Sequence, residues 1–422
     1  MDGHGQNRLA GRSTIGMLTR MALGVAGCAL LCGCLGPSAV SHTRTRYNEV
    51  YRDTNDEQLL LNIVRLRYAD SPVFVDLPNI TSQFEISGGG SYTYGLDGAG
   101  PGQSNLGFGS LALRDTPTIS YHPRGGRDIA KALLTPLSTE LLSVVNAGAT
   151  IEQFLLLAVN DINDVQNATR ATVLTPAMPD DNAEFREGVR QIAALALRGA
   201  VELVVTTTDS TEGASDPIPV NLVQGRDLVN AAKEGYVFRA RREGEVAIRK
   251  REKGLLLQVR PSEVDSVEMQ NLARAFRLKP GLATYKVKSE LAIDSDEGDR
   301  PGSEPGDTIY MNMRSILQIL TFLSKGVSVP QEHVLCGIAP MTAAADGVLF
   351  DWNAVTEGLF CVQAQKRRPK AAEVAVRYRG YWFYIAANDV QSRATLAILE
   401  LLFAVQESEG KPMGPTLTLP LG

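Results

Sequence analysis

Three of the five cysteines in this 422-residue chain lie within seven positions near its N-terminus, in the stretch CALLCGC. They are Cys28, Cys32 and Cys34, and only Cys336 and Cys361 lie in the remainder of the chain. A thiol forms a disulfide, binds a metal or accepts a covalent group. The four histidines are far apart in the sequence, so a zinc site built from Cys and His has little support. The N-terminal cysteines are therefore the first candidates for chemistry.

The residues around these cysteines have the layout of a secretory signal. Arg8, Arg12 and Arg20 form a basic leader, and residues 21–33 carry no charge. A basic region, 7–15 apolar residues and small residues before a cut are typical of a cleaved signal peptide. A helix of 13 residues spans about 20 Å, whereas the hydrocarbon of a bilayer is about 30 Å thick. The alternative is an anchor helix that runs past Val40, but its glycines and Pro37 disfavour a helix.

Leu31-Cys32-Gly33-Cys34 resembles the lipobox of bacterial lipoproteins, in which a Leu and two small residues precede the cysteine that is acylated. The resemblance implies that residues 1–33 are removed and that Cys34 receives palmitate-type acyl chains. Val25-Ala26-Gly27-Cys28 also fits, so Cys28 is the alternative, although cleavage there leaves a shorter apolar segment. An ordinary soluble secretory signal is the remaining alternative.

The resemblance also implies a cellular location. Two or more acyl chains anchor a protein stably, since each buried methylene contributes about 0.8 kcal/mol. Leu35 rather than Asp follows Cys34, which implies the outer membrane of a bacterial cell envelope, with the body in the periplasm. Membrane lipid is then the first expected partner.

A long hairpin is expected between residues 73 and 121, because apolar and polar residues alternate there on both sides of a Gly-rich turn. Its apolar positions are Phe84, Ile86, Tyr92, Tyr94, Leu96, Leu106 and Phe108, and Ser110 and Ala112 continue the alternation. One interpretation is a flexible surface hairpin. The other is a membrane hairpin over 83–113 that pairs with neighbouring copies, because unpaired strand edges cannot lie in lipid.

The remaining pattern predicts an α+β fold of helical segments and antiparallel hairpins. The expected regions are a signal peptide (1–33), an anchor and tether (34–43), a helical region with the hairpin (44–174), a small α+β region (175–293), an acidic disordered linker (294–307) and a C-terminal α+β region (308–422). Within these regions we expect a helix capped at Thr54 or Asn55, a helix over 150–169, separate strands at 245–250 and 255–260, and a helix capped by Ser262.

No motif in the sequence indicates catalysis, and no cofactor or metal is expected. The chain carries a net charge of −5, which becomes −7 without residues 1–33, and an acidic body argues against nucleic-acid binding. In an oxidising envelope a disulfide between Cys336 and Cys361 is allowed. The expected role is structural or interaction-based, with copies of the chain or another envelope protein as partner. The alternatives are a subunit of an outer-membrane pore or export complex and an envelope hydrolase.

Four stretches together resemble a recurring group of uncharacterised bacterial lipoproteins. They are NDEQLLLNIVRLRYADSPVFVD, PTISYHPRGGRDIAKALLTPLS, MRSILQILTFLSKGVSVP and YRGYWFYIAANDVQSRATLAILELLFAVQ. The likeness covers most of the mature chain. Residues 175–300 are the least similar part. This group has no established activity, so the resemblance implies a cellular location but no reaction.

Overall fold

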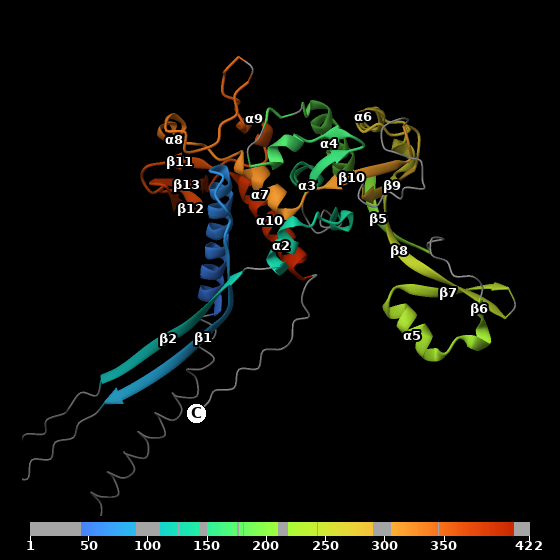
Figure 1. The fold of residues 1–422 in the computed structure, drawn as a ribbon, viewed down its shortest axis with the longest axis horizontal. Helices are drawn as coiled ribbons and strands as arrows, with labels where there is room; N and C mark the ends of the chain where they lie inside the picture. Colours follow the sequence, from blue (N-terminus) through green and yellow to red (C-terminus); the bar gives the residue numbers. More distant parts are fainter. Residues whose placement is uncertain are drawn as a thin grey trace, which may run out of the picture.

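The computed structural model describes residues 44–89, 110–124, 127–142, 150–174, 177–179, 181–209, 218–242, 244–289, 305–344 and 346–408. Helices and mostly antiparallel sheets make up the described chain, so the predicted α+β fold is confirmed. A body of packed helices and strands carries three projections (Figure 1): a helix over residues 44–67, a two-stranded hairpin and an arm at the opposite end.

A mixed sheet forms the centre of the body, with strand order β4-β3-β10-β9-β8-β5. These strands are β3 (Val159–Ile162), β4 (Val165–Gln166), β5 (Val201–Asp209), β8 (Glu245–Val259), β9 (Thr284–Ser289) and β10 (Thr308–Met313). Neighbours pair antiparallel except β9 and β10, which are parallel. The strands come from all three regions between 44 and 422, so these regions share one sheet and one hydrophobic core.

Helices pack around the strands of the body, and several begin at caps that the sequence supplies. They are α2 (Arg127–Leu134), α3 (Ile151–Ala158), α4 (Ala183–Leu197), α6 (Val267–Ala275), α7 (Ile316–Ser324), α8 (Gln331–Leu335), α9 (Asn353–Thr356) and α10 (Val390–Ser408), with short 3-10 turns η2 (Thr169–Thr172) and η4 (Pro261–Glu263). At the start of α7, Ser315 and Gln318 cap each other's backbone amides, which satisfies two donors that a helix otherwise leaves free.

A second, three-stranded sheet packs beside the upper half of the 44–67 helix. Its order is β11-β13-β12, from β11 (Gln363–Gln365), β12 (Ala372–Tyr378) and β13 (Tyr381–Ala386). The helix buries Leu60, Ile63 and Val64 completely. Its lower half is exposed and projects from the body (Figure 1).

The helix runs unbroken from residue 44 to 67, so the expected cap at Thr54 or Asn55 is wrong. The Thr54 hydroxyl donates to the carbonyls of Val50 and Tyr51, both at 2.9 Å. This back-bonding keeps a threonine within the helix.

The arm extends the sheet beyond the body. It consists of β6 (Ile218–Pro219), η3 (Val220–Leu222), α5 (Gly225–Lys233), β7 (Tyr236–Arg242) and the first half of β8. The expected separate strands at 245–250 and 255–260 are in fact this one strand of 15 residues. Its first half pairs with β7 and β6, and its second half pairs with β5 and β9.

Three other expectations are corrected by the structure. The helix expected over 150–169 ends at Ala158, and the chain continues as β3 and β4. Ser266, not Ser262, caps α6, because Pro261–Glu263 forms a 3-10 turn first. Residues 306–307 of the expected linker are ordered: Gly306 forms a β-bridge with Leu278, and Asp307 pairs with Lys286 at 3.2 Å. Residues 290–304 lie outside the described chain.

A fully buried arginine lies where β10 meets α7. The guanidinium of Arg314 donates to the Asn160 side-chain oxygen at 3.1 Å and to the carbonyls of Leu156, Leu157 and Asn167 at 2.9, 3.0 and 2.6 Å. Two of these carbonyls belong to the last turn of α3, where a helix has no donors of its own. One side chain at the start of α7 therefore joins α3, strand β3 and the residue that follows β4.

The surroundings of Arg314 keep its side chain charged although it has no contact with solvent. Burial lowers the pKa of Arg314 to about 9, and Asp161 acts in the opposite direction. The guanidinium also lies 4.0 Å from the centroid of the Phe322 ring, a favourable cation–π distance. At neutral pH the side chain remains a cation whose charge is spread over four bonded oxygens.

We expect Arg314→Met to lower the free energy of unfolding by about 3–5 kcal/mol, because it leaves several buried oxygens without donors. Urea unfolding followed by the fluorescence of the two tryptophans, Trp352 and Trp382, measures the change. Arg367→Met, at an exposed arginine, is the control. An equal loss in both variants would contradict the role given to Arg314.

Candidate functional site

The most prominent candidate is the hairpin of β1 (Phe74–Gly89) and β2 (Ser110–Arg124). The strands pair antiparallel from Phe74 opposite Arg124 to Gly89 opposite Ser110, with a register shift between Asp76 and Asn79. Figure 1 shows the paired strands extending away from the body on the side where residue 44 begins the chain's first described helix.

The hairpin contains part of the predicted membrane segment. Phe84 and Ile86 lie on β1, opposite Asp115 and Leu113 of β2. Tyr92, Tyr94, Leu96, Leu106 and Phe108 lie outside the described residues, as do Cys28 and Cys34.

Both edges of the hairpin are free among the described strands, because β1 and β2 form a sheet of their own. Unpaired strand edges present rows of N–H and C=O groups to any strand that approaches. A two-stranded hairpin is also marginally stable alone in water. The hairpin is therefore a natural place for another chain to associate.

A basic groove lies at the base of the hairpin, between the 44–67 helix and β12. It is a cavity of about 510 Å³, and Arg65, Arg368, Arg377 and Trp382 contribute to its lining. The guanidinium of Arg368 lies 5.3 Å from a ring centroid of Trp382. Glu57 is the only acid in the lining, so the groove suits a carboxylate or phosphate group.

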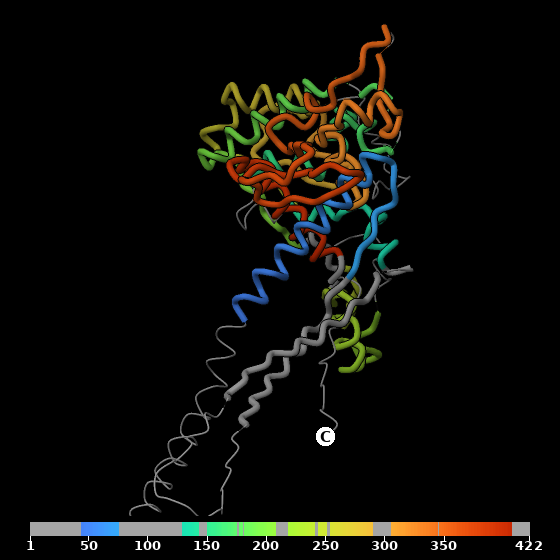
Figure 2. Tube along the Cα trace, turned by 90° about the vertical axis from the view of Figure 1, so that its left-hand side faces the viewer, coloured from blue at the N-terminus to red at the C-terminus, as the bar shows by residue number. Residues whose placement is uncertain are grey.

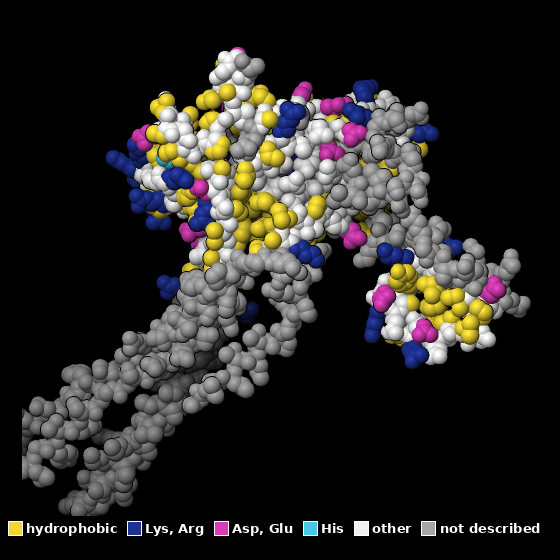
Figure 3. All heavy atoms as spheres, viewed as in Figure 1, with side chains coloured by type: hydrophobic (Ala, Val, Ile, Leu, Met, Phe, Trp, Pro, Cys, Tyr) yellow, Lys and Arg dark blue, Asp and Glu magenta, His cyan; other side chains and the backbone are white. Residues whose placement is uncertain are grey.

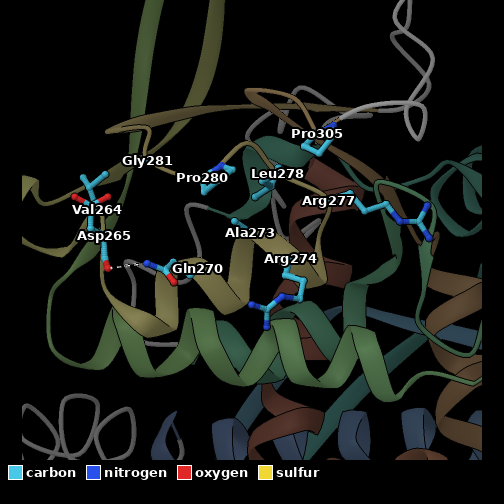
Figure 4. A pocket seen from close by; sticks show the side chains of 10 residues that line it. All are labelled: Val264, Asp265, Gln270, Ala273, Arg274, Arg277, Leu278, Pro280, Gly281 and Pro305. Carbon is cyan, nitrogen blue, oxygen red and sulfur yellow. Dashed lines mark hydrogen bonds between the residues drawn. The ribbon is translucent and has the colours of Figure 1, made fainter.

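A second cavity, of about 550 Å³, lies beside α6 (Figure 4). Asp265, Gln270, Arg274 and Arg277 supply its polar side chains. The Asp265 carbonyl accepts from the Gln270 amide at 3.2 Å, drawn as the dashed line. The lining holds one carboxylate and no histidine or cysteine, so it lacks a nucleophile–base pair.

Aromatic and charged side chains tie the end of the 44–67 helix to the small sheet. The Tyr68 hydroxyl lies 2.7 Å from Nδ1 of the buried His333, and burial raises the pKa of Tyr68 to about 12. Next to them the Tyr378 hydroxyl donates to Asp70, and Arg379 donates to the same carboxylate at 2.8 Å. The arrangement fixes the helix end and holds Tyr68 as a neutral phenol.

Two further buried cations lie under this cluster. Lys325 donates to the Val173 carbonyl at 2.9 Å, and burial, followed by the charge of Arg67, lowers its pKa to about 7. Arg67 donates to the Pro340 carbonyl at 2.6 Å, while its Nε has no partner among the described residues. Neither cation lines either cavity, so the unusual amine of Lys325 is not placed against a ligand.

A pair of carboxyl groups joins the 44–67 helix to α10. Glu400 and Asp56 are hydrogen-bonded to each other, and burial together with Asp56 raises the pKa of Glu400 to about 7. The pKa of Asp56 is raised by burial as well, so the two groups share a proton near neutral pH. Coupled carboxyls of this kind occur in hydrolases, but neither residue lines either cavity.

The disulfide that the sequence allows between Cys336 and Cys361 is not formed in the structure. Cys336 ends α8 and Cys361 lies before β11, and both are free, exposed thiols. The backbone of Cys361 is held against α10, because its amide donates to the Ser392 hydroxyl at 2.8 Å. Burial of part of the side chain raises the pKa of the Cys361 thiol, which makes it a weaker nucleophile at neutral pH.

Among the residues that the structure describes, no three His, Cys, Asp or Glu side chains are grouped so that they hold a metal ion. No described helix combines the length and apolar character needed to span a bilayer. No protein-family model, curated protein or solved structure matches the chain.

The Asp56–Glu400 pair predicts a pH dependence of stability. The pKa of Glu400 is higher in the folded chain than in the unfolded one, so the unfolded chain releases its proton first as the pH rises from about 4.5 to about 7, and the free energy of unfolding falls over that window. Glu400→Gln mimics the protonated acid. We expect it to remove this fall and to stabilise the protein by about 1 kcal/mol at about pH 7.5.

Urea unfolding at a series of pH values measures this slope. Asp56→Asn should flatten the slope too, because it removes the partner that shares the proton. Glu49→Gln, exposed on the same helix, is the control. If Glu400→Gln keeps the wild-type slope, the shared proton is not the cause.

Proposed function

We propose that the protein is a lipid-anchored envelope protein with a structural role, and that its β1–β2 hairpin associates with copies of the same chain. The observation that carries this proposal is the hairpin itself, which projects from the body and pairs with no other described strand. A catalytic role has no comparable support among the described side chains.

The position of the first helix supports an anchor on the same side. The start of the 44–67 helix lies below the body in Figures 1 and 2, and the far end of the hairpin lies below it in Figure 1. Cys34 precedes this helix by ten residues, which span at most about 35 Å. An acylated Cys34 would therefore hold a bilayer close to the hairpin.

The dimensions and free edges of the hairpin suit assembly at that bilayer. A strand of 16 residues is about 50 Å long, more than the 9–11 residues that a tilted transmembrane strand needs. In lipid both edges must be paired. Because each hairpin has two edges, head-to-tail pairing between copies forms a ring if the rotation closes.

The anchor is tested by metabolic labelling with palmitate. We expect Cys34→Ser to abolish labelling and Cys28→Ser to retain it, because the apolar segment before Cys34 has the length of a signal peptide. Loss of label only in Cys28→Ser would move the anchor to the alternative cysteine. No label in the wild-type chain would overturn the anchor.

The assembly is tested by native mass spectrometry of the detergent-extracted protein. We expect the wild-type chain to form a multi-subunit species and deletion of residues 88–110 to reduce it to monomers, because the deletion shortens the edges that pair. Deletion of residues 294–303, which leaves the hairpin intact, is the control. Monomers for both wild type and hairpin deletion would refute assembly through the hairpin.

A further inference from the structure

The arm carries an apolar surface that the rest of the described chain does not cover. Helix α5 packs on β7 but buries no residue completely. Val220 and Leu222 of η3 and Leu228 and Val229 of α5 are 49, 66, 47 and 54% exposed. Figure 3 shows hydrophobic side chains gathered on the arm. We call these four residues the apolar patch.

Cations border the patch along one stripe of α5. Arg226, Val229 and Lys233 follow one another at i, i+3 and i+7, so they lie on the same side of the helix. The Arg226 side chain is 77% exposed and lies 3.8 Å from Asp227, whose carboxylate also takes part in the capping box with Gln224. An amphipathic helix with cations beside its apolar face is typical of helices that lie at a membrane interface.

The arm points in the direction where a membrane is expected. In Figures 1 and 2, α5 lies below the body, as does the start of the 44–67 helix, and Figure 1 shows the hairpin projecting downward as well. Strand β8 runs from the arm into the body without a break, and β5 pairs with it from Val201 to Asp209, so the arm holds α5 at a defined position.

We propose that the apolar patch of the arm docks on an anionic lipid surface and gives the protein a second point of contact with the membrane. Leu222, Leu228 and Val229 enter the boundary between headgroups and acyl chains, while Arg226 and Lys233 bind lipid phosphates. A symmetric dimer through the patch would instead place these cations opposite their own copies. This inference rests on the lipid anchoring proposed above and adds a contact that the anchor does not require.

A fluorescent reporter on the patch tests the inference. Leu228→Cys is labelled with acrylodan in the acylated full-length chain carrying Cys336→Ser and Cys361→Ser, and is reconstituted on phosphatidylcholine vesicles with about 30% phosphatidylglycerol. We expect a blue shift of the emission, because position 228 leaves water for the interface. Val267→Cys, exposed on α6 of the body, is the matched control and should not shift.

Two additional samples make the outcome decisive. Adding Leu222→Ser and Val229→Ser should remove the blue shift while the acylated chain still floats with the vesicles. If palmitate labelling shows that the chain is not acylated, a histidine tag before residue 44 on vesicles with a nickel-chelating lipid provides the tether. A tethered chain with no shift at position 228 overturns the inference, and so does a shift that grows with protein concentration in the absence of lipid.

Discussion

One buried cation organises the body. A helix that ends inside a protein leaves carbonyl groups without donors, and α3 ends in the middle of the core. Arg314, directly after the neighbouring strand β10, supplies those donors and also binds Asn160 of β3 and Asn167 just after β4. Helix α3 therefore passes directly into β3 without a loop at the surface. The central sheet, and with it the placement of each projection, depends on this arrangement.

Much of the secondary structure is predictable because local signals agree. The turn at Arg379 and Gly380 has positive φ at both residues, as a tight two-residue hairpin requires, and the flanking strands alternate clearly. By contrast, an arginine in a sequence is ordinarily read as exposed, so the burial of Arg314 has no local signal. The continuity of β8 is hidden for a similar reason, since its charged middle resembles a turn although neighbouring strands pair along its length.

The candidate sites can likewise be predicted from the sequence only in part. The existence of the hairpin follows from the alternation around Phe84 and Ile86, but its register does not, because Gly-rich strands specify register weakly. The apolar patch on α5 cannot be recognised in advance, since Leu228 and Val229 have the spacing of ordinary core residues. Only the position of α5 on an arm leaves them in solvent. The basic groove likewise depends on Arg65 meeting Arg368 and Arg377, which lie about 300 residues further along the chain.

The unbroken strand β8 also restricts how this chain can change. Side chains alternate between the two faces of a strand, so one added or lost residue near its middle would reverse the faces of everything on one side of that point. Either Leu255 and Leu257 would leave the core of the body, or the side chains on the half of β8 that pairs with β7 would point to the opposite face of the arm. Insertions are therefore expected in the connecting loops and not in this strand, which links the evolution of the arm to that of the body.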